Sequence, residues 1–289
     1  MENNKYAIFI LTNGRPDNVI TYGTLRKSGY TGKIYLICDD EDKQLARYQE
    51  KYGDEVIVFR KSDYVGKFDM MDNLDGNKVI VYARNACYDI ARSLGLDYFF
   101  EYEDDYTSFT HRFIKGQKLG YAKVNRMDDV CNAFIECLKS TGATTIAMAQ
   151  GGDYIGGASS FNHLQYKRKA MNSFVFKVNK DSEDDCIFIG RMNDDVNTYL
   201  TLGSVGHIFF QIADIMLNQL ATQSNDGGNT EAYKTMGTYV KSFYSVIAAP
   251  SCVKVSAMGV SNIRLHHKIN WKNAVPKIIR EDLKNDQTS

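Results

Sequence analysis

The chain has 289 residues, enough for one large α/β domain or two small ones with an ample core. Hydrophobic residues make up 44% of it and three residues are proline, a globular composition that excludes a disordered chain. Its 35 basic and 35 acidic residues cancel, which excludes a global field that would draw the protein to nucleic acid or a membrane.

The first part of the chain alternates strands and helices. Tyr6–Leu11, Ile34–Cys38 and Val56–Phe59 are continuous apolar runs, typical of strands buried on both faces. We expect one helix to begin near Asp17 and another to cover Lys43–Tyr52. This spacing predicts parallel pairing in a Rossmann-like half. No G-x-G-x-x-G follows the first strand, which disfavours NAD or FAD.

The middle of the chain continues the pattern. A helix is predicted over Ala83–Leu94, followed by a strand over Tyr98–Tyr102. Asp128 is expected to cap a helix that runs to Lys139, and Thr144–Ala149 is the next predicted strand.

The last part of the chain is less regular. Phe174–Val178 and Cys186–Gly190 are predicted strands, and a helix should start near Asp194. Residues 206–220 form either a strand followed by a helix or one buried helix, and we expect a flexible loop near residues 222–230. No composition break marks a boundary, so a single domain is predicted.

The cysteines and the first residues of the chain indicate the cellular compartment of the protein. The six cysteines form no C-x-x-C pair and lie mostly among apolar residues, which predicts reduced core side chains. The start of the chain lacks the features of a signal peptide, and no run has transmembrane length. We expect a soluble, cytoplasmic protein that does not bind membranes.

Three consecutive carboxylates end the strand at residues 98–102. Glu103, Asp104 and Asp105 repel one another, and holding them at the end of a buried strand costs free energy unless a cation or donor compensates. Ligands usually bind at the carboxyl ends of strands in open α/β sheets. These acids therefore predict a site for Mg²⁺ or Mn²⁺ and a sugar nucleotide. The alternative is an acidic turn.

Other candidate residues follow other predicted strands or open predicted helices. Asp39 and the first turn (Thr12, Asn13 and Arg15) are candidates for holding a nucleoside. Arg84 and Asn85 open a helix whose N-terminal amides favour an anion such as a diphosphate.

Two further pairs are candidates for chemistry. Asp194 or Asp195 would take the proton from an acceptor hydroxyl, and His266 or His267 would complete a metal shell. Acid pairs at helix starts are often caps, and histidine pairs often pack in cores or on surfaces, so both alternatives stay open.

Several motifs in this order resemble those of GT-A fold glycosyltransferases, in which a metal-binding D-x-D follows a strand. Here Glu replaces its first acid. More narrowly, the chain resembles the phage TET-associated glycosyltransferases that modify 5-hydroxymethylpyrimidines in DNA. The resemblance spans roughly residues 6–280. The motifs that carry it are Ala83-Arg84-Asn85-Ala86-Cys87, Glu103-Asp104-Asp105-Tyr106, the run from Gly190 to Thr198 and the run from Trp271 to Lys277.

The resemblance implies an α/β fold with a GT-A-like, Rossmann-related mixed sheet flanked by helices. Residues 1–110 would form the nucleotide-sugar-binding half and residues 111–289 the acceptor-binding half. It also implies a UDP-sugar donor, a divalent metal, and DNA containing 5-hydroxymethylcytosine or 5-hydroxymethyluracil as acceptor, in the host cytoplasm if the gene is phage-encoded.

The resemblance also implies roles for single residues. Asp105, with Glu103 or Asp104, would hold the metal together with a late histidine, and Asp195 is the first choice of base. A base flipped out of the duplex would stack on Tyr154 or Phe161.

Acid-free segments are the candidates for contacts with DNA phosphates. Residues 106–127, 154–180 and 232–280 contain Lys and Arg but no Asp or Glu, although chance clustering would also produce this. Lys167, Arg168 and Lys169 form the most concentrated patch.

Other functions stay open on the sequence alone. A GT-A enzyme with a polysaccharide or protein acceptor fits the same motifs. A non-catalytic nucleic-acid-binding protein on a transferase-like fold would also fit, although two separate acid clusters argue against it. A nucleotidyltransferase is disfavoured, because only one glycine follows the first strand. The sugar, the pyrimidine, the stereochemistry and the oligomeric state are not determined.

Overall fold

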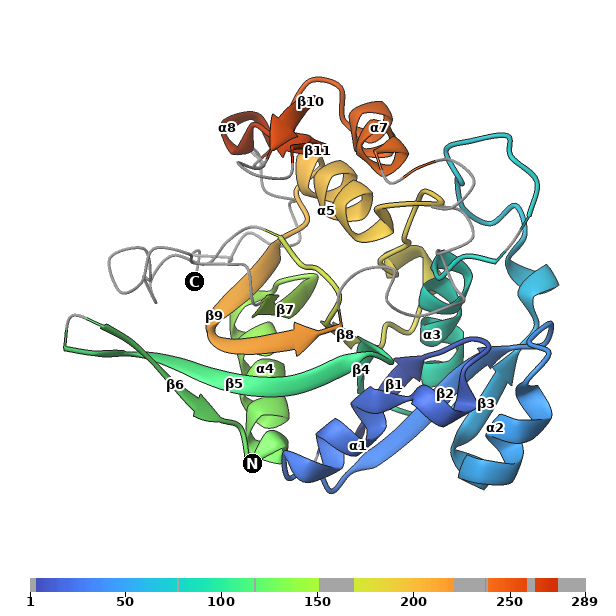
Figure 1. Ribbon diagram of the computed structural model, residues 1–289. Coiled ribbons are helices and arrows are strands. Elements are labelled where there is room, and N and C mark those ends of the chain that lie inside the picture. Colours follow the sequence, from blue (N-terminus) through green and yellow to red (C-terminus); the bar gives the residue numbers. More distant parts are fainter. Residues whose placement is uncertain are drawn as a thin grey trace, which may run out of the picture.

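A computed structural model describes residues 4–76, 78–116, 118–150, 169–220, 237, 239–258 and 263–274. Its centre is a nine-stranded mixed sheet with strand order β3-β2-β1-β4-β8-β7-β9-β5-β6, and a two-stranded sheet pairs β10 with β11 (Figure 1). The strands are β1 (Tyr6–Leu11), β2 (Lys33–Asp39), β3 (Val56–Phe59), β4 (Tyr98–Glu103), β5 (Tyr106–Lys115), β6 (Lys118–Lys123), β7 (Thr145–Gln150), β8 (Phe174–Lys177), β9 (Phe209–Gln219), β10 (Val253–Met258) and β11 (Arg264–Ile269).

Helices cover both faces of the large sheet. The described α-helices are α1 (Ile20–Lys27), α2 (Leu45–Tyr52), α3 (Val81–Ser93), α4 (Met127–Thr141), α5 (Asp194–Ser204), α7 (Val240–Ala248) and α8 (Trp271–Ala274). Single 3₁₀ turns lie at η1 (Pro16–Asn18), η2 (Gly53–Glu55), η3 (Lys61–Tyr64) and η5 (Ser182–Asp184).

The parallel half places strand ends at one edge. β3, β2, β1 and β4 run parallel to one another, so their carboxyl ends meet at one edge of the sheet. Side chains alternate along β1: Phe9 belongs to the core cluster that contains α3, whereas Ile8 and Ile10 belong to the cluster that contains α4. This two-sided burial explains why β1 is apolar at every position.

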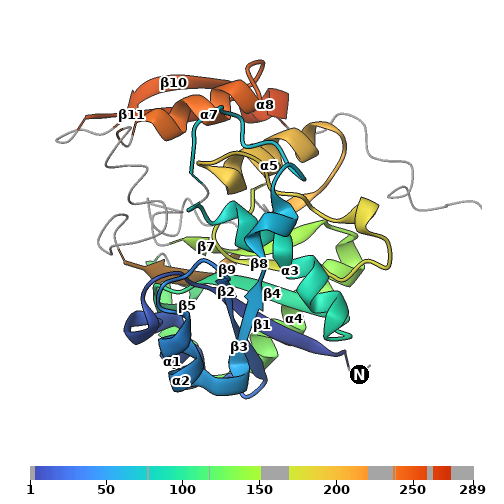
Figure 2. The same ribbon diagram turned by 90° about the vertical axis from the view of Figure 1, so that its right-hand side faces the viewer.

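The other half of the sheet is largely antiparallel. β8 pairs antiparallel with β4 and β7, and β5 pairs antiparallel with β9 and β6, while β7 and β9 run parallel. A smaller layer of α7, α8, β10 and β11 lies beyond α5, as Figure 2 shows. Tyr199 of α5 stacks on Trp271 of α8 with ring centroids 5.8 Å apart, which joins the layers.

Several sequence predictions for this half were wrong. Residues 206–220 contain one strand, β9 (Phe209–Gln219), and no helix, and residues 186–190 are irregular. Asp128 does not cap α4, because its carboxylate accepts bonds from the amide and hydroxyl of Thr31. The loop predicted near residues 222–230 lies outside the described residues.

The predicted fold class is confirmed: the chain forms a mixed α/β sheet flanked by helices, with a Rossmann-like parallel half. Within the described ranges, no helix combines the length and apolarity needed to cross a bilayer.

Candidate active site

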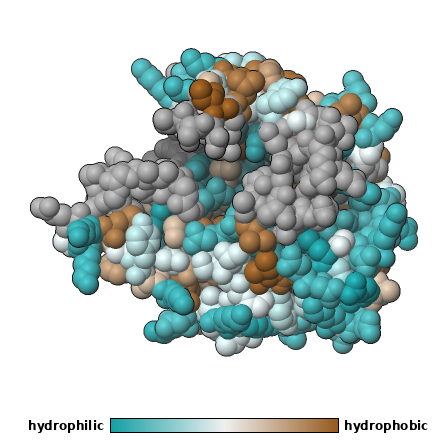
Figure 3. All heavy atoms as spheres, in the orientation of Figure 1, coloured by the Kyte–Doolittle hydropathy of each residue, from teal (hydrophilic) through white to brown (hydrophobic). Residues whose placement is uncertain are grey.

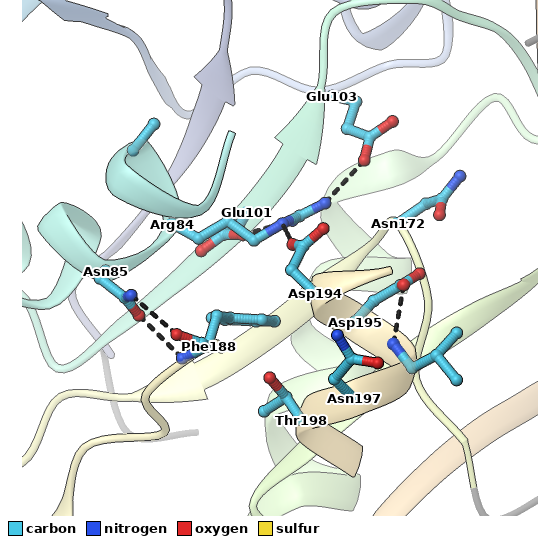
Figure 4. Close-up of polar contacts among 12 residues, drawn as sticks. Arg84, Asn85, Glu101, Glu103, Asn172, Phe188, Asp194, Asp195, Asn197 and Thr198 are labelled. Atoms are coloured by element: carbon cyan, nitrogen blue, oxygen red, sulfur yellow. Dashed lines mark hydrogen bonds and ion pairs between the residues drawn. The ribbon is translucent and has the colours of Figure 1, made fainter. Parts of the chain in front are cut away.

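A buried arginine organises the centre of the site. Arg84, in the first turn of α3, is 2% exposed and directs its three nitrogens at three acids (Figure 4). Nε lies 2.5 Å from Asp194 Oδ2, Nη1 lies 2.6 Å from Glu101 Oε1, and Nη2 lies 2.6 Å from Glu103 Oε1. The guanidinium also lies over the rings of Phe174 and Phe188. One cation thus joins α3, the end of β4 and the start of α5.

This cluster contains more acid than base. Burial raises the pKa of Glu103 to about 8, with Arg84 opposing the shift and nearby acids adding to it. Burial likewise raises the pKa of Glu101 to about 7, again against the effect of Arg84. A single guanidinium therefore does not compensate these carboxylates, and a further cation would stabilise their ionised forms.

Asp194 and Asp195 have different environments at the start of α5. Asp194 is buried and ion-paired to Arg84. Asp195 is partly exposed and accepts a bond from the amide of Val196 at 2.7 Å. Burial and the charge of Asp194 raise the pKa of Asp195 to about 6. Asp195 thus combines solvent access with a pKa close to the range that suits a general base.

Asn193 fixes the start of α5 against the outer layer. Its backbone is left-handed, with φ 54°, and its amide nitrogen donates to the carbonyl of Lys241 at 2.8 Å and to Ser245 Oγ at 3.1 Å. This places α5, and Asp195 with it, in a fixed position relative to α7.

The end of β1 is joined to the acids after β4. Thr12 donates to Asp104 Oδ2 at 2.6 Å and bonds the hydroxyl of Tyr48. Arg15 Nε lies 2.8 Å from the same Asp104 oxygen, and the backbone amide of Arg15 donates to Tyr48. Asp104 therefore holds the first turn in place, and its neighbour Glu103 is ion-paired to Arg84.

Asp39 is held by three donors. Asn13 Nδ2 donates to its Oδ2 at 2.8 Å, and Lys61 Nζ and the backbone amide of Glu41 each lie 3.0 Å from its Oδ1. Lys61 is 2% exposed and also bonds Glu41. Lys61 was not among the candidate residues predicted from the sequence, because it follows a strand in a stretch of mostly polar residues.

Asn85 has a structural contact that the sequence did not predict. Its side-chain amide donates to the carbonyl of Phe188 at 3.0 Å and accepts from the amide of the same residue at 2.8 Å. This pair holds the irregular segment that leads to Asp194. Neither Asn85 nor Arg84 has a side chain directed at solvent, since both are buried.

Asp105 has the features of a metal ligand. Its Oδ1 is buried and has no hydrogen-bond partner among the described atoms, and burial and Asp104 raise its pKa to about 6. In the described part of the chain, no group of three His, Cys, Asp or Glu side chains forms a complete metal shell. Mg²⁺ bound with substrate phosphates takes only one or two protein carboxylates, and Asp105 and Glu103 fit that requirement.

The two late histidines lie side by side on β11, with ring centroids 4.3 Å apart. His267 Nδ1 lies 3.3 Å from Asn193 Nδ2. This Asn193 atom is assigned as the amide nitrogen, a donor, because it also lies within hydrogen-bond distance of a backbone carbonyl. Nδ1 of His267 therefore accepts, and Nε2 carries the proton. His266 Nδ1 faces the carbonyl of His267 at 2.8 Å and donates to it, which leaves Nε2 of His266 with a lone pair.

The electrostatics support a neutral His267. Burial lowers the pKa of His267 to about 4, and the electrostatic influence of the neighbouring His266, Lys241 and Lys169 acts in the same direction. A neutral imidazole with Nε2 protonated is a hydrogen-bond donor. Of the residues predicted to contact the acceptor substrate, Lys169 lies near enough to His267 to affect its pKa. The others lie outside the described residues: Tyr154, Phe161, Lys167 and Arg168.

A second group of polar contacts, centred on Asp72, was not predicted from the sequence. Arg191 bonds both oxygens of Asp72, at 2.7 and 3.0 Å, and the carbonyl of Leu74 at 2.7 Å. Tyr244 of α7 donates to Asp72 at 2.5 Å. The loop before α3, the segment before α5 and the outer layer are therefore tied together.

The site lies at the carboxyl edge of the parallel half of the sheet, where ligands bind in open α/β folds, and it contains a buried acid cluster. The model of the TET-associated glycosyltransferase family matches residues 6–228, well over half of the chain. The chain therefore belongs to the TET-associated glycosyltransferase family, which confirms the resemblance seen in the sequence. No curated protein matches it in sequence.

Two solved structures illustrate what the fold of the chain is similar to. S. aureus TarS 1–349 in complex with UDP has 11% identity and a TM-score of 0.45, with 84% of this chain and 65% of that chain covered. Glucosyl-3-phosphoglycerate synthase from Mycobacterium tuberculosis, in complex with Mn²⁺, UDP and phosphoglyceric acid, has 7% identity and a TM-score of 0.46, with 92% and 87% covered. The chain thus spans less than two thirds of the TarS fragment.

Proposed function

We propose that the protein transfers a sugar from a UDP-sugar to the hydroxyl of a 5-hydroxymethylpyrimidine in DNA, with a divalent metal bound at Glu103 and Asp105. Membership of the TET-associated glycosyltransferase family is the observation that carries the proposal. The buried, unpartnered oxygen of Asp105 supports the metal site.

The nucleoside of the donor would lie against the ends of β1 and β2. Asp39 and Asn13 bond each other there, and Lys61 fixes the other oxygen of Asp39. Because these groups are held in advance, they lose little side-chain entropy when a base or ribose binds.

The diphosphate would lie between the acids and the late histidines. Mn²⁺ or Mg²⁺, when bound, would neutralise the charge that develops on the leaving UDP. His267 is suited to donate from Nε2 to a phosphate oxygen, and Lys169 and Lys241 lie close enough to influence its charge. If a histidine completes the metal shell, His266 has the required tautomer.

Asp195 is the proposed base. It would take the proton from the acceptor hydroxyl as that oxygen bonds the anomeric carbon and the bond from that carbon to the diphosphate breaks. Asp194 is less suited, since its carboxylate is ion-paired to Arg84 at 2.5 Å. We propose that Arg84, Glu101 and Asn85 are positioning residues that hold β4, α3 and α5 together, and that neither Arg84 nor Asn85 contacts the diphosphate.

Two binding measurements test this proposal. Calorimetry should show UDP binding that strengthens when Mn²⁺ or Mg²⁺ is added. Retention on DNA that contains hydroxymethylated pyrimidines, but not on glycans, should fall as salt rises. DNA binding without any affinity for UDP or a UDP-sugar would instead indicate a non-catalytic nucleic-acid-binding protein.

A further inference from the structure

The β5–β6 hairpin extends from the body of the sheet. Pairing of β5 with β9 ends at His111, whereas its pairing with β6 continues to Lys115. Figure 1 shows the hairpin projecting to the left, away from the helices. β5 begins at Tyr106, directly after Asp105, so the hairpin connects the candidate metal site to the periphery.

The hairpin exposes basic and large apolar side chains together. No Asp or Glu occurs in residues 106–127. Figure 3 shows hydrophilic and hydrophobic residues side by side at this end of the molecule. The exposed basic residues are Lys115, Lys118 and Lys123, and the exposed large apolar residues are Phe113, Ile114 and Tyr121.

Both faces of the hairpin carry this combination. The register pairs Lys115 with Lys118 and Phe113 with Gly120, which places both lysines and the phenylalanine on one face. A Cβ at Gly120 would lie 2.6 Å from the Phe113 ring, so glycine allows that ring to lie across the strand. Tyr121 and Lys123 project from the other face.

Edge protection alone does not explain this pattern. Lysines on an edge strand such as β6 discourage pairing with other chains. Protection of an edge does not, however, call for a 57% exposed Tyr121 or for an exposed Phe113 and Ile114 beside the lysines. A surface with only positive charges and exposed aromatic rings is complementary to nucleic acid.

We propose that the β5–β6 hairpin binds the backbone of the acceptor DNA about one helical turn from the target base. This inference rests on the proposed DNA acceptor and extends it. At ~3.4 Å per residue, the ten residues of β5 span about 30 Å, which is close to the ~34 Å of one turn of duplex. A two-stranded ribbon also has dimensions that a major groove admits.

The test compares DNA affinity for two lengths of unmodified duplex, of about 8 and about 30 base pairs. The variant is Lys115→Gln, Lys118→Gln and Lys123→Gln combined. A matched control carries Lys5→Gln, Lys27→Gln and Lys43→Gln, three exposed lysines outside the hairpin. Fluorescence anisotropy at several salt concentrations gives the Kd and its salt dependence for each protein, with thermal melting as a check of folding.

For the long duplex, we expect the hairpin variant to bind ~10- to 100-fold more weakly and its log–log salt slope to decrease by about 3. The control and wild type should behave alike, and the short duplex should bind all three proteins similarly. Equal affinities and slopes of the hairpin variant and the control for the long duplex would overturn the proposal. Aggregation of the hairpin variant, with a monomer that binds the long duplex as tightly as the wild type does, would also overturn the proposal.

This outcome is independent of catalysis. The assay contains no UDP-sugar, so absence of sugar transfer would contradict the proposed function without affecting the result for the hairpin. A second variant, Tyr121→Ser, removes a ring without changing charge. It should weaken binding of the long duplex and leave the salt slope unchanged, and unaltered binding would contradict a contact between Tyr121 and the DNA backbone.

Discussion

Arg84 and Asp194 are 110 residues apart in the chain, yet Nε of the arginine lies 2.5 Å from Oδ2 of the aspartate in the buried centre of the molecule. The pair joins α3 to α5. It therefore fixes the neighbouring Asp195 relative to the carboxyl end of β4, which bears Glu103.

Arg84→Met should destabilise the protein strongly. The substitution would leave Glu101 and Asp194 buried without their cation, and breaking a buried ion pair typically costs ~3–5 kcal/mol. Urea unfolding measures the change. Arg126→Met is the control, because its exposed pair with Asp129 should contribute at most ~1 kcal/mol. Similar losses in both variants would contradict a central role for Arg84.

Asp195→Asn should remove activity and leave the fold and UDP affinity intact. We expect kcat to fall by about 100- to 10,000-fold, the usual contribution of a general base. Asp194→Asn, in contrast, should reduce both stability and kcat, because it removes the Arg84 ion pair. Kinetics and thermal melting on the two variants separate these roles. An Asp195→Asn enzyme with normal kcat would show that the base lies elsewhere.

With Mn²⁺ saturating, so that Asp105 and Glu103 stay ionised, the pH dependence of kcat/KM should report Asp195. Its pKa is raised to about 6, and a base acts only when deprotonated, so kcat/KM should rise with pH and level off above about 7. His267, with a pKa lowered to about 4, stays neutral over this range and adds no inflection near 6.5. The residual activity of Asp195→Asn should lack the step near pH 6. A step that persists in this variant would assign it to another group.

Removal of Asp105's charge should abolish metal binding. In the wild type, Mn²⁺ with UDP should raise the melting temperature and EDTA should reverse the rise, since a ligand that binds only the folded state stabilises it. Asp105→Asn should lose this response and the transfer activity. The control Asp54→Asn, at an exposed position, should behave as wild type. A normal Mn²⁺ response in Asp105→Asn would refute the proposed ligand.

The sequence predicted the parallel half of the fold well, because its strands are buried on both faces and read as unbroken apolar runs such as Tyr6–Leu11. It predicted β9 poorly. Buried and partly buried residues alternate only over residues 209–215 of Phe209–Gln219, and the apolar content of the strand also suits a buried helix. The place of β5 and β6 in the large sheet was not predicted, since pairing of β5 with β9 depends on residues about a hundred positions apart.

For the site, the acids at residues 103–105 and 194–195 were recognised from their positions at element ends. The sequence could not separate their contacts, which depend on three-dimensional packing: Asp104 holds Thr12 and Arg15, and Asp194 holds Arg84. One signal was overlooked. Glu101 is a charged residue within a buried apolar strand, and such a residue requires a buried cation.

A transfer screen tests the proposed DNA acceptor directly. UDP-sugars are incubated with the protein and Mn²⁺ on duplex DNA that contains 5-hydroxymethylcytosine or 5-hydroxymethyluracil, and the nucleosides are analysed by mass spectrometry. We expect a glycosylated hydroxymethylpyrimidine with the wild type, and none with EDTA or with Asp195→Asn. Transfer to a polysaccharide or protein acceptor, with both DNA substrates unmodified, would refute the DNA acceptor.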